Sequence, residues 1–134
     1  MSSFTLKIVT PDGLRYEGPA EGITLRTSSG DMGILPGHIN AVAPLGMGLA
    51  TIIIDGKKRY AACIGGMVSV VGDAVSVVAT SFEWADGIDR DRAARSEEKA
   101  KAVLADKSAS KADIQLAEAR LKRALIRQNV YDRK

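Results

Sequence analysis

The chain has 134 residues, 46% of them hydrophobic and 26% charged, with a formal net charge of +3. This composition is typical of a globular protein and argues against a disordered chain. The length fits one ordinary domain, or one small domain with an appendage. The small net charge does not indicate a nucleic-acid partner. No apolar run approaches the ~20 residues of a membrane helix, so we expect no direct membrane insertion.

A single cysteine, Cys63, excludes an internal disulfide and is typical of a reducing compartment. It lies in the apolar run Tyr60–Ile64, so we expect a buried, inert thiol. The first residues, Met1–Phe4, lack the basic and apolar regions of a secretory signal. We therefore expect any link to a membrane to run through another protein.

The charge and the composition both change near residue 88. Residues 1–88 carry six Lys or Arg and eight Asp or Glu, a net charge of −2. Residues 89–134 carry thirteen Lys or Arg and eight Asp or Glu, a net charge of +5. Beyond Gly87 the chain contains neither Gly nor Pro. We predict a slightly acidic body, residues 1–86, and a basic C-terminal appendage, residues 87–134.

The body is predicted to consist of strands. Alternating or apolar runs are separated by turn residues such as Pro11-Asp12-Gly13, Asp55-Gly56 and Gly72-Asp73. Gly65-Gly66 is expected to end one run, and the five glycines and two prolines of residues 30–48 rule out a helix there. Eight to ten short strands with close, regular spacing indicate an all-β sandwich or a flattened barrel.

The appendage is predicted to form an antiparallel helical hairpin. Asp89 is a good N-cap for a helix over about residues 90–105. Ser110, with Asp113 three residues later, indicates a second helix over about residues 111–131. The apolar faces are mostly alanine (Ala93, Ala100 and Leu104; Ile114, Ala117, Leu121, Ala124 and Leu125). Because alanine buries little surface, we expect the hairpin to be held weakly against the sandwich.

Motifs of enzymatic chemistry are missing from the sequence. The glycine-rich stretch never reaches the Gly-Lys-Ser/Thr of a phosphate-binding loop, and no Gly-x-Ser-x-Gly occurs. One Cys and one His do not make a metal site. We therefore expect no catalytic residues and no bound metal. We expect His38 to be an exposed histidine in a loop. An enzyme that uses His38 as a catalytic residue is kept as a minor alternative.

Two basic faces are predicted in the hairpin. Asp89 and Arg92 share a helix face, and Lys99 lies seven residues beyond Arg92. Arg123 and Arg127 share a face of the second helix. If the helices fold together, these cations can bind a polyphosphate near a helix N-terminus. A solvated basic surface explains the same spacing, so the sequence pattern leaves both readings open.

Several stretches resemble the epsilon subunit of the bacterial and chloroplast F-type ATP synthase, called delta in mitochondria. They are Val9–Gly13, the segment Gly-Asp-Met-Gly-Ile-Leu-Pro-Gly-His at residues 30–38, Gly65-Gly66 and Ile88–Ala93, followed by two helices. The resemblance implies a ten-stranded β-sandwich followed by a two-helix hairpin. It implies a non-catalytic rotor subunit that helps to couple proton translocation to ATP synthesis and inhibits ATP hydrolysis through a mobile hairpin.

The partners implied by the resemblance are the gamma subunit, the membrane c-ring and, when the hairpin extends, the alpha/beta catalytic head. The implied location is peripheral, on the cytoplasmic face of the cell membrane or the stromal face of the thylakoid. Asp31 and His38 match a loop that faces the c-ring. A free-standing ATP-sensing module is the alternative function. ATP is implied as a regulatory ligand, without a catalytic cofactor.

The resemblance also implies an ATP site in the hairpin. Some members bind ATP with the motif Ile/Leu-Asp-x-x-Arg-Ala, which is intact at residues 88–93. Lys99 stands where these members place an Arg, so it keeps the charge but loses the planar fork. The acidic groups are expected to accept hydrogen bonds from adenine or ribose, and the basic groups to neutralise phosphates. The implied binding residues are Glu83, Ile88, Asp89, Arg92, Ala93, Lys99, Arg123 and Arg127.

Overall fold

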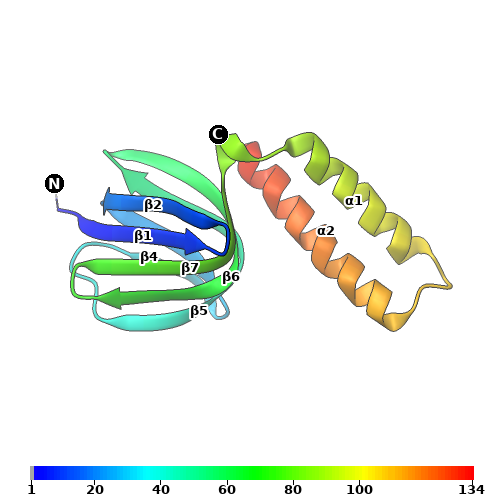
Figure 1. Ribbon diagram of the computed structural model, residues 1–134, viewed down its shortest axis with the longest axis horizontal. Coiled ribbons are helices and arrows are strands. Elements are labelled where there is room, and N and C mark those ends of the chain that lie inside the picture. Colours follow the sequence, from blue (N-terminus) through cyan, green and yellow to red (C-terminus); the bar gives the residue numbers. More distant parts are fainter. Residues whose placement is uncertain (1) are drawn as a thin grey trace.

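The computed structural model describes residues 2–134 as a β-sandwich with a helical hairpin beside it (Figure 1). Seven strands are followed by a short 3₁₀ helix and two α-helices. The elements are β1 (Phe4–Thr10), β2 (Gly13–Ala20), β3 (Gly22–Thr27), β4 (Gly30–Ile34), β5 (Ala41–Ile54), β6 (Lys57–Val71), β7 (Ala74–Trp84), η1 (Ala85–Gly87), α1 (Arg90–Ala105) and α2 (Lys111–Tyr131).

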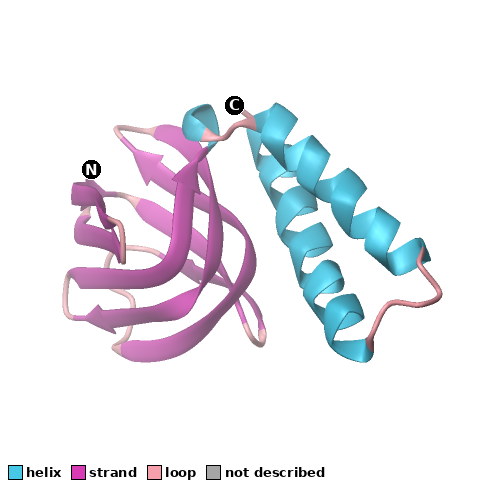
Figure 2. Cartoon of the chain, turned by 45° about the vertical axis from the view of Figure 1, so that its right-hand side comes forward, coloured by secondary structure: helices cyan, strands magenta, loops and turns pink. Residues whose placement is uncertain are grey.

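The strands form one curled sheet in the order β2-β1-β7-β6-β5-β3-β4. All neighbours are antiparallel except β1 and β7. The sheet folds over so that its two halves enclose the core (Figure 2). Alternation places one set of side chains inside, including Leu6, Ile8, Ile52, Val77 and Phe82, each at most 1% exposed. The predicted β-sandwich is therefore confirmed.

The number of strands differs from the prediction of ten, because the long strands do not break at their glycines. β6 runs through Gly65 and Gly66, which have φ values of +67° and +113°. A Cβ atom at Gly66 would lie 1.9 Å from the carbonyl oxygen of Val78. Glycine lets the strand bend there while Gly66 stays paired with Ala79 of β7. The glycines therefore curve the sheet without dividing its strands.

Cys63 lies inside the sandwich on β6 and is 4% exposed. Burial raises the pKa of its thiol to about 12. The predicted core position of this thiol is confirmed, and the raised pKa disfavours the thiolate, which is the reactive form.

The end of β7 is fixed by aromatic contacts at Trp84. The indole Nε1–H donates to the carbonyl of Arg15 at 3.2 Å. Phe82 and Tyr16 pack edge-on against the ring, and the guanidinium of Arg59 lies 3.9 Å from the ring centroid. The chain therefore leaves the sandwich from a well-held point, immediately before η1 and the hairpin.

The two helices have the predicted limits. The carboxylate of Asp89 accepts the backbone N–H of Arg92 at 3.0 Å, and the hydroxyl of Ser110 accepts that of Asp113 at 3.1 Å. Both N-caps are therefore confirmed. Four buried alanines line the contact between the helices: Ala93, Ala100, Ala117 and Ala124. The described helices include none that is long and apolar enough to cross a membrane.

Polar contacts also join the helices to each other. The guanidinium of Arg90 donates to both carboxylate oxygens of Asp132, at 2.9 and 3.2 Å. The side-chain amide of Gln128 donates to Glu97 at 2.8 Å. The Arg90–Asp132 contact ties the start of α1 to the end of α2, and the Gln128–Glu97 contact joins the last part of α2 to the middle of α1.

The hairpin contacts the sandwich through a small apolar cluster and not through the alanine seam. Ile88 and Val130, 5% and 0% exposed, pack with Ala62 and Ala85. Ile126 and three other partly buried side chains, Leu49, Tyr60 and Tyr131, surround the cluster. The sequence reading assigned weak docking to the alanine faces, but these faces join α1 to α2. Leu125, predicted on the buried face, is 47% exposed.

Candidate functional site

A cavity of about 310 Å³ lies where β7, the junction and both helices meet. This volume is at the lower end of the range for small-molecule sites. Five of the eight residues implied by the resemblance line it: Glu83, Asp89, Arg92, Ala93 and Arg127. Gly87, Ser96 and Ala124 complete the lining and were not anticipated. Ser96 was accessible to sequence reasoning because it lies four residues after Arg92 on the same helical face.

The carboxylate of Asp89 lies at the start of α1. One oxygen, Oδ1, is engaged as the N-cap of the helix. The guanidinium of Arg92, one turn later, is exposed. A helix N-terminus attracts negative charge and Arg binds phosphate by paired hydrogen bonds. This side of the cavity therefore offers both a hydrogen-bond acceptor and groups that attract anions.

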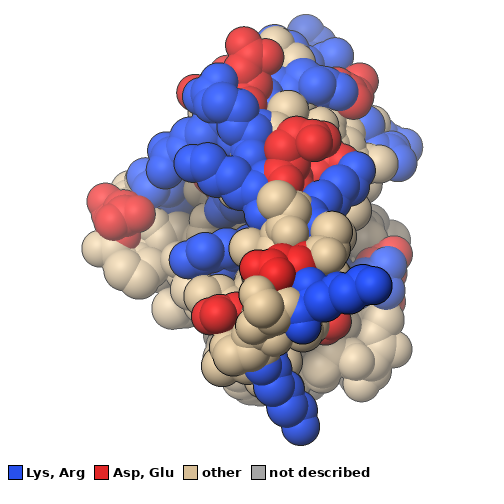
Figure 3. Space-filling view, turned by 90° about the vertical axis from the view of Figure 1, so that its right-hand side faces the viewer, with Lys and Arg blue, Asp and Glu red and all other residues tan. Residues whose placement is uncertain are grey.

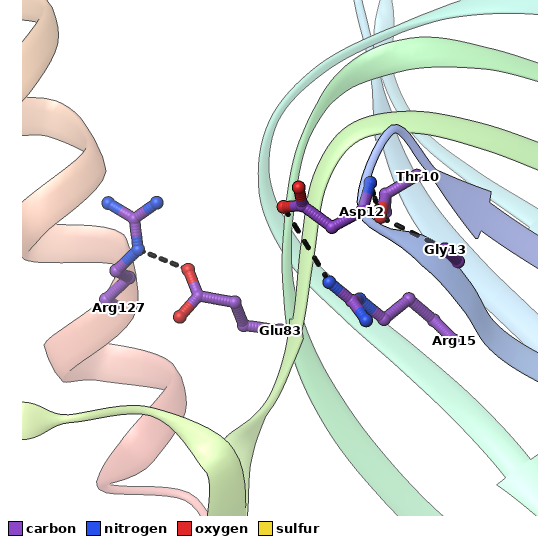
Figure 4. A network of polar contacts seen from close by, with 6 residues as sticks. All are labelled: Thr10, Asp12, Gly13, Arg15, Glu83 and Arg127. Carbon is purple, nitrogen blue, oxygen red and sulfur yellow. Dashed lines mark hydrogen bonds and ion pairs between the residues drawn. The ribbon is translucent and has the colours of Figure 1, made fainter.

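Glu83 and Arg127 both line the cavity and form an ion pair, which Figure 4 shows. Nε of Arg127 donates to Oε1 of Glu83 at 2.5 Å. Both side chains are partly buried, Arg127 with 27% and Glu83 with 34% of the side chain exposed. Glu83 belongs to β7 and Arg127 to α2. This ion pair therefore joins the sandwich directly to the hairpin.

The other three predicted residues are placed differently. Ile88 is buried in the apolar cluster under α2, so its side chain holds the junction and does not face the cavity. Lys99 lines a second hollow, farther along the hairpin. Arg123 lines neither of these two spaces. The structure therefore divides the predicted set instead of bringing it together at one point.

The second hollow is an open groove of about 700 Å³ between α1 and α2. Arg92 and Ser96 line both the groove and the cavity, so the two spaces are adjoining. Arg95 and Arg120 line the groove and were not singled out from the sequence. Arg95 follows Arg92 by three residues, which is a helical spacing. The position of Arg120 depends on how the helices pair, which sequence spacing does not give.

Asp31 and His38 do not lie on one loop, contrary to the sequence prediction. Asp31 is within β4, where it pairs with Arg26 of β3 at 3.1 Å. His38 lies in the connection after β4, and its Nδ1 is 2.7 Å from the carbonyl oxygen of Ile39. The β3–β4 turn beside Asp31 faces α2 across a crevice. The two residues are therefore separated by most of β4.

An apolar row crosses the outer face of the sandwich. The strand register aligns Leu14 with Val9, Val9 with Val78, Val78 with Met67, and Met67 with Pro44. Leu14, Val78 and Met67 are 53%, 55% and 44% exposed. We call these five residues the apolar row. A contiguous exposed apolar surface is a common mark of a protein contact.

Comparison with known sequences identifies close relatives. Residues 3–85 match the family model described as "ATP synthase, Delta/Epsilon chain, beta-sandwich domain". The ATP synthase epsilon chain of Bacillus cytotoxicus is 43% identical over 134 residues, covering 100% of both chains. That of Bacillus subtilis is 42% identical over 108 residues, covering 81% of this chain and 82% of the relative.

Comparison with solved structures agrees. A chain of the mitochondrial ATP synthase of Euglena gracilis, solved with OSCP, F1 and the c-ring, superposes with a TM-score of 0.79. It is 26% identical, and the match covers 91% of this chain and 77% of that one. A chain from the Tetrahymena thermophila central stalk and c-ring shares the fold, with a TM-score of 0.59. The chain described here belongs to the epsilon chain family of the F-type ATP synthase.

Proposed function

We propose that this chain is a rotor subunit that couples proton translocation to ATP synthesis and restrains ATP hydrolysis with its helical hairpin. As an epsilon chain it is a non-catalytic subunit of the synthase. The observation that carries the regulatory part is the construction of the hairpin contact. One small apolar cluster and the Glu83–Arg127 ion pair hold the hairpin on the sandwich.

The gamma subunit is proposed to bind the apolar row on the sandwich. The row is supported because it is exposed and lies on strands that the core holds rigidly. Co-purification with a gamma subunit tests this surface, using Val78→Asp to place a charge in the row. We expect this variant to lose most of the complex, while Ser76→Asp on the same face of β7 retains more. Failure of the unmodified chain to bind gamma would favour the free-standing ATP-sensing module.

The c-ring is proposed to contact the sandwich at Asp31 and at the connection that contains His38. Leu35 and Ile39 flank His38 and are 64% and 78% exposed, which supports a partner there. The subunit would then lie peripherally, on the cytoplasmic face of the cell membrane or the stromal face of the thylakoid. Cross-linking from cysteines placed at positions 31 and 38 of the assembled complex, with Cys63 left in place, checks each contact separately.

The extended hairpin is proposed to bind the alpha/beta catalytic head. Its net charge of +5 favours an acidic surface and speeds the encounter. Removing residues 88–134 tests the role. We expect the assembled complex to keep coupling and to hydrolyse ATP faster. Unchanged hydrolysis would contradict an inhibitory role for the hairpin.

ATP is proposed to stabilise the folded hairpin as a regulatory ligand. The cavity supports this because Glu83 comes from the sandwich, whereas Asp89, Arg92 and Arg127 come from the hairpin. A ligand that contacts both parts stabilises the docked state. At a concentration one hundred times its dissociation constant, it adds about 2.7 kcal/mol to the state that binds it. Hydrolysis is not required for this effect.

Calorimetric titration of ATP into the full-length chain tests this proposal. We expect saturable binding that Arg92→Ala weakens strongly, with Lys122→Ala as a matched change in the other helix. Lys122 lies in the crevice between α2 and the sandwich, away from the cavity. An absence of saturable heat, or equal affinities for all three proteins, would remove ATP as the ligand of this cavity.

A further inference from the structure

We infer that a pocket beside Trp84 binds a carboxylate side chain of an acidic protein partner, and that it does so while the hairpin is docked. The pocket has a volume of about 200 Å³. Among the described residues it shares no wall with the junction cavity or with the groove between the helices. We call it the Trp84 pocket, and its walls include Lys58, Arg59, Tyr60, Trp84, Arg133 and Lys134.

The walls of the Trp84 pocket come from both parts of the fold. Positions 58–60 belong to the start of β6, and Trp84 ends β7. Arg133 and Lys134 follow α2. They are brought to the sandwich by Val130, which is fully buried in the apolar cluster. If the hairpin leaves the sandwich, these two cations leave with it, so the pocket is complete only in the docked state.

Two guanidinium groups are held over aromatic rings at the pocket. That of Arg59 lies 3.9 Å from the ring centroid of Trp84, and that of Arg133 lies 5.9 Å from the ring centroid of Tyr60. A guanidinium over a ring face keeps its N–H groups at its edges for hydrogen bonds. Nε of Arg133 donates to Asn129 at 3.3 Å, which leaves its terminal nitrogens for a ligand. Both cations are therefore positioned for a carboxylate before it arrives.

The positive charge of the pocket is not balanced by its surroundings. Lys58, Arg59, Arg133 and Lys134 are exposed and belong to none of the ion pairs found within residues 2–134. Asp86 is the one acidic side chain among the described lining residues, so positive side chains exceed negative ones by three. Bringing like charges together costs repulsion, which a bound anion relieves.

An acidic residue next to the pocket does not neutralise it. Asp132 precedes Arg133 in the sequence, but its carboxylate accepts two hydrogen bonds from Arg90 of α1. It is therefore engaged within the hairpin, and the pocket keeps its affinity for a negative group from outside.

The size and the rings of the pocket favour an acidic side chain over a free inorganic anion. A volume of about 200 Å³ is below the usual range of small-molecule sites, so it suits a single side chain. Tyr60 and Trp84 offer apolar ring surface beside the cations. The methylene groups of a glutamate can pack on such rings, whereas phosphate and sulfate have no apolar part. An acidic segment of a protein fits both features.

The charge of the hairpin favours the encounter with such a partner. Figure 3 shows Lys and Arg side chains spread over much of the face that the hairpin presents. Residues 89–134 carry a net charge of +5, which attracts acidic surfaces. A partner held in the Trp84 pocket stabilises the docked hairpin, because the complete pocket exists only in that state. This effect goes beyond the proposed function, and it opposes extension of the hairpin without a nucleotide.

Fluorescence titration tests the pocket, because Trp84 is the only tryptophan of the chain. The probe is a capped ten-residue peptide of alternating glutamate and glycine, added to the full-length chain. We expect a saturable change in fluorescence. Arg59→Gln and Arg133→Gln should each weaken the affinity about tenfold, as for the loss of a charge-assisted hydrogen bond.

Two matched variants control for the general loss of charge. Lys57→Gln changes the residue next to the pocket on β6, and Lys122→Gln changes α2. Neither residue lines the pocket, so each variant should change the affinity less than twofold. Circular dichroism confirms that all four variants stay folded. With peptide at ten times its dissociation constant, amide exchange of the docked hairpin should slow about tenfold.

Several results would overturn this inference. A fluorescence of Trp84 that does not respond to the peptide would remove the site. Equal losses in the two control variants would show attraction to the whole basic surface. An equal response to sulfate, or to the same peptide with glutamine in place of glutamate, would exclude recognition of an acidic segment. A loss with Arg59→Gln but not with Arg133→Gln would place the ligand on the sandwich alone and break its link to the hairpin.

Discussion

The sandwich and the hairpin of this chain bury different kinds of side chain. The sandwich core consists mainly of large side chains such as Phe82, Leu6 and Ile52, brought together from distant parts of the sequence. The hairpin buries alanines between its helices. Among the described residues, the buried cluster at its contact with the sandwich consists of Ala62, Ala85, Ile88 and Val130. Burying a large apolar side chain contributes about 1.5–3 kcal/mol, whereas alanine contributes much less. The chain thus combines a body that has a large apolar core with an appendage that rests on it through a small apolar cluster.

The largest loss of stability is expected from a substitution in the sandwich core. Phe82→Ala removes a side chain that is 1% exposed, and we expect a loss of about 3–5 kcal/mol in the free energy of unfolding. Urea denaturation followed by circular dichroism measures it. Val78→Ala, on the same strand but 55% exposed, should cost less than about 0.5 kcal/mol. Similar losses in both variants would mean that the inner face of β7 does not carry the stability.

The next largest loss of stability is expected from a substitution at the bend of β6. Gly66→Ala places a methyl group against the carbonyl of Val78 at a φ of +113°. We expect a loss of at least about 2 kcal/mol, since strained backbone alone costs 1–3 kcal/mol. Gly72→Ala is the control, because its φ is +62° but no atom lies within 4 Å of the added group. It should cost about 1–2 kcal/mol, and thermal unfolding of both variants shows whether the clash adds to the strain.

Val130→Ala tests the contact between the hairpin and the sandwich, because it removes two methyl carbons from the apolar cluster. At about 0.8 kcal/mol per buried carbon, the docked hairpin should lose about 1.5 kcal/mol. Amide hydrogen exchange should quicken in α1 and α2 by about tenfold while the sandwich stays protected. Leu125→Ala, at a site 47% exposed on the same helix, is the matched control. Equal quickening in the sandwich would show that the two parts open as one unit.

Acidification gives the smallest expected effect, and the carboxyl groups whose pKa is lowered lie in the hairpin. The hydrogen bond from Arg90 lowers the pKa of Asp132, and hydrogen bonds from Lys101 and then Gln128 lower that of Glu97. A lowered carboxyl pKa contributes stability above the ordinary carboxyl range that is lost as the pH falls through the lowered value. The protection factors of the hairpin amides, which compare the exchange rate with the intrinsic rate at the same pH, should therefore fall in that acidic range.

Asp132→Asn supplies the control for this pH dependence. The variant should exchange faster at neutral pH and should respond less to acid, because Arg90 no longer meets a carboxylate. An identical acid response in the variant and the unmodified chain would assign the effect to Glu97 or to other carboxylates.

Much of the local structure was predictable because it depends on near neighbours in sequence. Asp89 and Ser110 mark both helix starts through hydrogen bonds to residues three positions later. The tight turns at Asp55-Gly56 and Gly72-Asp73 connect strands as expected. Gly65-Gly66 misled the strand count, since a glycine pair signals a break or a bend equally well. Only the facing carbonyl of Val78 shows why glycine is needed there.

The candidate site was predictable only in part. The motif at residues 88–93 lies at the junction, and five of the eight expected residues line one cavity there. Ile88 belongs to the docking cluster because the path of the chain after β7 turns its side chain under α2. Arg120 joins Arg95 and Lys99 because of how two antiparallel helices face each other. Neither arrangement follows from spacing along one helix.

The sequence by itself determined the two-part organisation, the strand and helix character of each part, the caps and the alanine seam, because these depend on contacts within a few residues. The tertiary structure decided what the seam joins, where the hairpin rests and which cations share a space. These depend on the relative orientation of elements that are distant in sequence, as with Glu83 of β7 and Arg127 of α2. Side-chain packing fixes that orientation, through large side chains within the sandwich and through the small cluster around Ile88 and Val130 between the sandwich and the hairpin.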